Sequence, residues 1–230
     1  MARSYFKLEG KDEVVIFEKL LNYYTKEKSG LSISHISLSE AYEKLQRVSD
    51  GGRVFTALID ILINVTLLKC EMVPAEIARR KLCNTEQPET VLDSPNFFID
   101  LMDLHRLNTA FIFRYRALWD KMMGFLILVL TPSDYDKFCE AKSKKRFFKN
   151  CMLKIKNFPR DLIHNIDRLL RDFDNKYRTP EAHLTGSMRK YSFSKVYFDE
   201  NTQFLLLEFW TPMNEMLIEI GEVIKIMPQE

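Results

Sequence analysis

Glycine and proline are scarce in this chain, with 7 and 8 residues among 230. Because these residues mark the tight turns between short strands, their scarcity favours long helices. Internal repeats and low-complexity tracts are absent from the sequence as well. A chain of this length can bury a substantial core, in one large or two small domains, without disulfides or metals.

Cysteine is also rare, and the four cysteines are Cys70, Cys83, Cys139 and Cys151. They form no C-x-x-C pair and have no histidine at a spacing typical of zinc sites, so we expect reduced thiols, no metal and no cofactor. We expect no signal peptide, because no basic segment with an apolar stretch opens the chain. The apolar run 122–130 is too short for a bilayer, and the run 54–68 contains Asp60 and Asn64. These features predict a soluble, cytoplasmic protein that makes no membrane contact.

Three common catalytic motifs are missing: a glycine-rich phosphate loop, G-x-S-x-G and H-E-x-x-H. Only four histidines occur in the sequence. His35 lies in a polar segment, while His105 and His164 lie in predicted helices. For these three, a surface or core role is the ordinary explanation, which leaves His183.

Helical periodicity is what the sequence has in abundance. Apolar residues recur at helical spacing in eight segments: 12–28, 39–48, 54–71, 74–82, 94–130, 133–156, 159–173 and 211–226. Ser94 followed by Pro95 is typical of a helix start. Segment 54–71 is apolar on all sides, which predicts the central buried helix. We expect residues 84–93 to form the principal exposed loop.

The segment 190–210 departs from this periodicity. Its alternating and aromatic residues flank a polar turn at 199–202, a pattern that favours a β-hairpin, with an aromatic-rich helix as the alternative. We therefore expect a single all-α domain over 1–230, an antiparallel helical bundle with a small β-hairpin near the C-terminus. Residues 1–93 would supply N-terminal helices, and 94–230 the part that carries the motif discussed next.

Positive charge is concentrated in residues 141–160, which hold eight cationic side chains and no acidic one, although the net charge of the chain is only +2. The five candidate substrate-binding residues in this segment are Lys142, Lys144, Lys145, Arg146 and Lys149. A solvated helix face is the ordinary explanation for any single lysine. For the cluster as a whole, attraction to a phosphate backbone explains the pattern better.

Downstream, four residues separate Arg178 from His183. Thr179 is suited to cap a helix, Pro180 to its first position, and Glu181 to the positive end of its dipole. Both Arg178 and His183 could then face one phosphate beside free backbone N–H groups. A capped helix start with an incidental histidine would give the same pattern.

Three further side chains could support this pair: Asp174, Glu181 and Arg114. Asp174 precedes the pair and could orient it, or it could be a surface residue at a helix end. Arg114 could line a cleft with Asp120 or Lys121. Ion pairs on the helix surface are the alternative role for such residues.

An R-x4-H motif at a helix start, late in an all-α chain of this length, resembles the HEPN superfamily, whose signature Arg178 and His183 match. The resemblance implies a four- to five-helix bundle, usually a homodimer, in which two motifs converge in one cleft. Many members are metal-independent ribonucleases in defence or toxin systems. The resemblance implies that Arg178 holds the scissile phosphate. It also implies that His183 transfers a proton as the 2′-hydroxyl attacks, leaving a cyclic phosphate.

These roles agree with the chemistry of the two side chains. Arginine supplies planar donors for developing phosphoryl charge, and histidine has a pKa suited to acid–base catalysis. We therefore expect a metal-independent RNA endonuclease that acts as a homodimer, as a defence or toxin effector with a protein partner or antitoxin. The alternative is a non-catalytic helical interaction module or a subunit of a defence complex.

Overall fold

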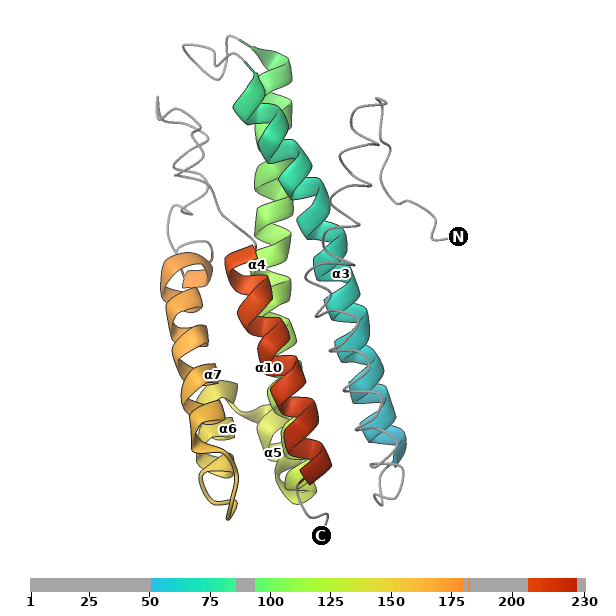
Figure 1. Cartoon of the computed structure of the whole chain (residues 1–230), viewed down its shortest axis with the longest axis vertical. Coiled ribbons are helices and arrows are strands. Elements are labelled where there is room, and N and C mark those ends of the chain that lie inside the picture. Colours follow the sequence, from blue (N-terminus) through green and yellow to red (C-terminus); the bar gives the residue numbers. More distant parts are fainter. Residues whose placement is uncertain (1–50, 86–93, 180–181, 183–206, 227–230) are drawn as a thin grey trace.

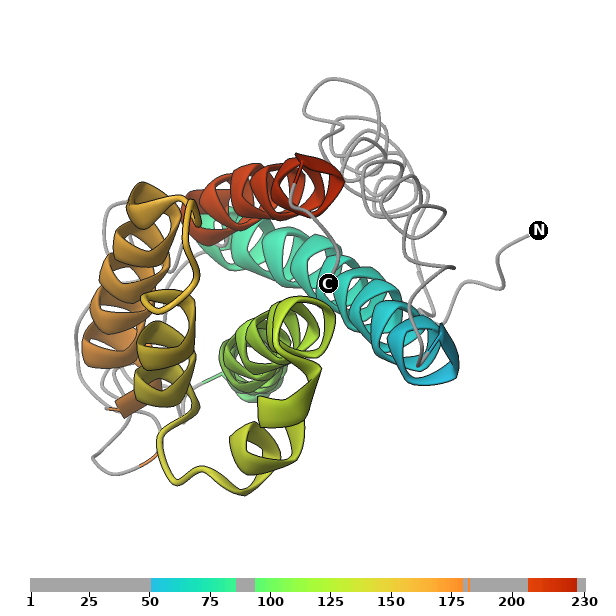
Figure 2. The ribbon, with the colours of Figure 1, turned by 90° about the horizontal axis from the view of Figure 1, so that it is seen from below.

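The computed structural model describes residues 51–85, 94–179, 182 and 207–226. Four long helices make up most of this part of the chain: α3 (Gly51–Asn84), α4 (Pro95–Leu130), α7 (Arg160–Phe173) and α10 (Leu207–Ile226). They lie along one axis and alternate in direction (Figure 1). Seen along that axis, α3, α10 and α7 are arranged around α4 (Figure 2). The described residues contain no strand, so the all-α prediction is confirmed for them.

Helix α4 begins and ends where the sequence predicts. The Ser94 hydroxyl oxygen accepts a hydrogen bond from the Phe97 backbone N–H at 3.4 Å, which satisfies one of the donors that a helix start leaves unpaired. At the other end, Thr131 leaves the helical conformation before a proline that cannot continue the helix. Between Leu118 and Val129, every side chain except those of Asp120 and Lys121 is buried.

Helix α3 joins two segments that the sequence analysis predicts as separate helices, 54–71 and 74–82. The predicted break at Pro74 is wrong, because the proline lies inside one helix of 34 residues. Met72 and Ala75 are both buried against the core. Packing on either side of the proline therefore offsets the backbone hydrogen bond that it removes.

The two faces of α3 differ in burial, although both are apolar. The buried face is formed by Val54, Leu58, Ile61, Val65 and Leu68. The opposite face exposes four large side chains, which we call the α3 stripe: Phe55 (47%), Ile59 (37%), Ile63 (52%) and Leu67 (39%). The prediction that 54–71 is the central buried helix is therefore wrong, and α4 holds that position.

The single helix predicted over 133–156 is divided into three elements: η3 (Pro132–Asp134), α5 (Tyr135–Glu140) and α6 (Lys144–Met152). Ala141 is extended, with φ −65° and ψ 129°, which ends α5. Ser143 then accepts a hydrogen bond from the Arg146 N–H at 3.4 Å and begins α6. The serine at 143 is an N-cap signal that the apolar periodicity obscured.

Helix α7 begins one residue after its predicted start, at Arg160, and ends at the predicted Phe173. A π-helical turn, η4 (Asp174–Arg178), continues directly from α7.

Helix α10 begins at Leu207 rather than at the predicted residue 211. Residues 207–210 are therefore helical, as in the alternative to the hairpin, and they form no part of a strand. Residues 190–206 lie outside the described part of the chain. None of the described helices combines the length and apolar character needed to cross a membrane.

Candidate nucleic-acid interface

The cationic segment 141–160 folds as the loop after α5, helix α6, the loop that follows it and the first residue of α7. Lys142 and Arg146 are exposed, whereas Lys144, Lys145 and Lys149 are half-buried. Further exposed cations of this segment are Lys154, Lys156 and Arg160. We call the surface formed by these eight side chains the basic face.

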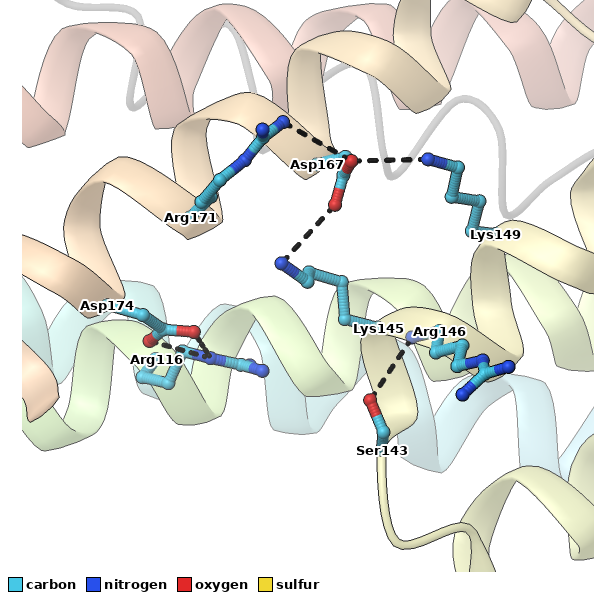
Figure 3. Close-up of polar contacts among 8 residues, drawn as sticks. All are labelled: Arg116, Ser143, Lys145, Arg146, Lys149, Asp167, Arg171 and Asp174. Carbon is cyan, nitrogen blue, oxygen red and sulfur yellow. Dashed lines mark hydrogen bonds and ion pairs between the residues drawn. The ribbon is translucent and has the colours of Figure 1, made fainter.

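Asp167 of α7 is the shared partner of three cations (Figure 3). Its carboxylate lies 3.3 Å from Lys145 Nζ, 3.2 Å from Lys149 Nζ and 3.5 Å from Arg171 Nη2. Burial alone would raise the pKa of Asp167, but the hydrogen bonds and charges of Lys149 and Lys145 outweigh burial and lower it. One carboxylate cannot neutralise three cations, so this region keeps a net positive charge. The role of Asp167 is not visible in the sequence, because no local pattern links it to lysines 18 or more positions away.

We expect Asp167→Asn to lower the free energy of unfolding by roughly 1–2 kcal/mol at pH 7, because charged hydrogen bonds are lost. The lowered pKa of Asp167 means that its contribution is complete above the ordinary value of 3.8 and disappears as the pH falls through the lowered value. Chemical denaturation at pH 7 and near pH 3 should therefore show a difference between wild type and variant that shrinks in acid. Asp172→Asn, at an exposed position of α7, is the control. An equal difference at both pH values would contradict the assignment.

Arg178 does not lie beside a helix start. Thr179 is helical, with φ −66° and ψ −46°, and its N–H donates to the Asp174 carbonyl oxygen. The predicted N-cap role of Thr179 is therefore wrong, and this N–H is not free to bind an anion. In a π turn, a carbonyl oxygen accepts a hydrogen bond from the N–H five residues later in the chain. This arrangement suits the residues before Pro180, because proline has no N–H to donate to an α-helical carbonyl. Arg178 is half-buried in this turn.

An ion-pair network attaches the π turn to α4 (Figure 3). Arg116 Nε lies 3.2 and 3.3 Å from the two carboxylate oxygens of Asp174. Arg116 Nη1 lies 2.6 Å from Asp120 Oδ1, one turn along the same helix. The side chains of Arg116 and Asp174 are only 14% and 19% exposed, so the pairing is largely shielded from water. Asp174 therefore supports Arg178 through the backbone of η4, by fixing the turn to α4.

Aromatic packing fixes the same turn from the other side. The buried Tyr177 ring lies 5.8 Å from that of Phe173 and 5.0 Å from that of Phe209 in α10. The Tyr115 hydroxyl of α4 donates to the Phe209 carbonyl oxygen at 3.2 Å. Burial raises the pKa of Tyr115, so the hydroxyl keeps the proton that it donates. Helices α4, α7 and α10 thus meet around Tyr177, the residue before Arg178.

Arg114 lies away from the basic face. Its Nε donates to Glu71 Oε1 at 2.7 Å, which joins α4 to α3. Burial raises the pKa of Glu71, and the Arg114 charge and hydrogen bond oppose this shift. The role of Arg114 is therefore the ion pair with Glu71, and not the position in a cleft that was the other expectation from the sequence. Asp120 and Lys121, however, do line a pocket between α3, α4 and α5.

Glu181 and His183 lie outside the described part of the chain. Their placement relative to Arg178 therefore stays a prediction from the sequence. Among the residues that the structure describes, no group of three or more His, Cys, Asp and Glu side chains is arranged to hold a metal ion.

No protein-family model, curated protein or solved structure matches the chain. The described residues define an all-α protein in which α6 and the loop after it carry a basic face. Beside this face, Asp167 of α7 pairs with α6, and Asp174 of η4 pairs with Arg116 of α4.

Proposed function

We propose that this protein binds single-stranded RNA on the basic face and cleaves it as a metal-independent endoribonuclease of the HEPN type. The observation that carries the proposal is that η4, which ends at Arg178, continues directly from α7, the helix whose Asp167 contacts α6. Asp167, Arg171, Asp174 and Arg178 follow one another at steps of four, three and four residues. Such spacing places side chains along one side of a helix, and Asp167 on that side contacts α6.

The distance along this row separates two roles. Eleven positions from Asp167 to Arg178 correspond to roughly 16 Å at 1.5 Å per helical residue. One phosphate cannot bridge that distance. The basic face would therefore hold phosphates that flank the cleavage site, while Arg178 holds the scissile one. Phosphate contacts of this kind position a strand without reading its sequence.

The proposed reaction needs one anion-binding group and one proton carrier. The 2′-oxygen attacks phosphorus as its proton passes to a base, and the bond to the 5′-oxygen breaks as that oxygen receives a proton. The products are a 2′,3′-cyclic phosphate and a 5′-hydroxyl. Arg178 would stabilise the added charge on the phosphoryl oxygens, and His183 would transfer protons. A homodimer would supply a second histidine, so that one acts as base and the other as acid.

We expect RNA affinity to fall steeply as salt concentration rises, because each bound phosphate releases counterions. Lys142→Ala and Arg146→Ala should each reduce the slope of log K against log salt by about 0.7. Arg106→Ala removes an equally permanent charge, 70% exposed on α4, and should leave the slope unchanged. Fluorescence anisotropy of a labelled oligonucleotide measures the slope. A flat response in the wild type would remove the basic face from the proposal.

A second candidate function is a helical interaction module, and the α3 stripe favours it. Contiguous exposed apolar side chains on a folded protein commonly mark a contact with another protein. The stripe repeats every four residues over three helical turns, which suits an apolar helix of a partner protein. In this function the residues around Arg178 would only be structural.

A further inference from the structure

A pocket of about 620 Å³ lies between α3, α4 and α5, and Lys144 of α6 also lines it. Small-molecule sites commonly have volumes of roughly 300–1,000 Å³. Ala57, Ala117 and Gly124 leave room above the helix backbones. At Gly124, a Cβ atom would lie 2.9 Å from the Phe138 ring, so only glycine lets this ring pack so closely on α4. We propose that the pocket holds the base of an unpaired nucleotide whose phosphate binds Lys144, an inference that deepens the proposed function and rests on it.

Two aromatic rings of α5, from Tyr135 and Phe138, line the pocket. The Arg53 guanidinium carbon of α3 lies 4.9 Å from the Tyr135 ring centroid. Aromatic rings and arginine guanidinium planes are the surfaces on which unpaired bases stack. The same guanidinium is paired with Asp136 at 2.7 Å, which holds it against Tyr135. A planar base entering the pocket therefore meets the aromatic surface of α5 beside this fixed guanidinium.

Two carboxylates in the lining can accept hydrogen bonds from base N–H groups. Asp60 accepts from Asn64 Nδ2 at 3.1 Å and is paired with Lys121. Asp120 is paired with Arg116 at 2.6 Å. A carboxylate has about four acceptor positions, so each can receive a further donor. Because these ion pairs hold the two carboxylates in place, amino groups of a base would find preformed acceptors.

Lys144 supplies the charge that a phosphate needs. Its Nζ donates to the Cys139 carbonyl oxygen at 3.1 Å and lies 5.0 Å from the Phe138 ring centroid. Both contacts are with neutral groups, and an ammonium has three donors, so Lys144 can bind an anion without breaking an ion pair. Exposed Lys142, in the loop before α6, would hold the next phosphate. A base inside a duplex cannot enter the pocket, so the arrangement selects unpaired strands.

The test compares the affinity of wild type and variants for a single-stranded oligonucleotide, its duplex and a free nucleoside 5′-monophosphate. Ala117→Leu fills the pocket and should weaken single-strand binding by about tenfold, the effect of losing one stacked base, with duplex affinity unchanged. Lys144→Ala should reduce the preference for the single strand over the duplex. The controls are Asn150→Leu, at an exposed site of α6, and Lys137→Ala, which removes one exposed charge of α5 outside the basic face. Both controls should leave that preference unchanged.

The outcomes separate the pocket from the proposed function. If RNA binds and neither Ala117→Leu nor Lys144→Ala changes the single-strand preference, the pocket assignment is wrong while RNA binding stands. If no RNA binds, but the free nucleotide does and Ala117→Leu weakens it, the proposed function is wrong and the pocket takes a free nucleotide. If neither RNA nor nucleotide binds, both are wrong. Should Ala117→Leu fail to fold, the comparison of Lys144→Ala with Lys137→Ala decides the matter.

Discussion

Replacing His183 with alanine is expected to abolish RNA cleavage measured in EDTA. Acid–base catalysis by one histidine contributes a factor on the order of 10²–10⁴ to the rate, so the residual activity should fall below the detection limit of a practical assay. Arg178→Ala should have a comparable effect, because the charge that develops on the phosphoryl group would lose its planar donors. The measurement is the rate of cleavage of a labelled RNA at constant protein concentration.

His164→Ala is the matched control for this prediction, because His164 is an exposed histidine of α7. It should retain full activity, and all three variants should keep nearly the melting temperature of the wild type. Equal cleavage by wild type and His183→Ala would contradict the nuclease assignment. The interaction module suggested by the α3 stripe would then be the better account.

Replacing Arg116 with alanine is expected to cause a large loss of stability. The change would leave the carboxylates of Asp174 and Asp120 without their common cation. Removing one partner of a buried ion pair typically costs about 3–5 kcal/mol, because the remaining charge stays buried and uncompensated. Asp120 is 30% exposed and partly screened, so we expect a value near the lower end. Denaturant unfolding measures the change in free energy.

Arg106→Ala provides the comparison for Arg116→Ala within the same helix. Its partner Asp103 lies 3.4 Å away, and the two side chains are 70% and 59% exposed. Surface pairs of this kind contribute at most about 1 kcal/mol. A similar loss of stability in the two variants would show that the Arg116 network does not anchor η4.

The sequence predicted the helix ends that local capping determines. Ser94 and Pro159 both mark the start of a helix as expected, because N-caps and prolines act on their own few residues. The breaks between consecutive helices were less predictable. Pro74 fails to interrupt α3 because tertiary packing continues past it, whereas Ser143 starts a new helix within an unbroken apolar pattern.

The apolar face of α3 shows a further limit of sequence periodicity. A helix that is apolar on all sides is normally buried, yet the α3 stripe is exposed in the fold. Burial depends on which helix the others surround. The central position belongs to α4, although α4 carries charged residues, mainly in its first two-thirds. Apolar character alone therefore did not distinguish α4 from α3.

The candidate site was predictable in composition but not in its pairings. The concentration of cations in 141–160 is visible in the sequence, and the fold leaves five of the eight exposed. The attachment of Lys145 and Lys149 to Asp167, and of Arg116 to Asp174, joins separate helices. Such contacts depend on how helices are rotated against one another, which side-chain spacing within one segment does not specify.

The proposed cleavage of RNA by Arg178 and His183 proceeds by attack of the 2′-hydroxyl. The most direct measurement is end-group analysis of total tRNA incubated with the purified protein in EDTA. We predict 2′,3′-cyclic phosphate and 5′-hydroxyl ends with the wild type, and intact tRNA with His183→Ala. Intact tRNA with the wild type, or fragments that carry 5′-phosphates, would contradict it.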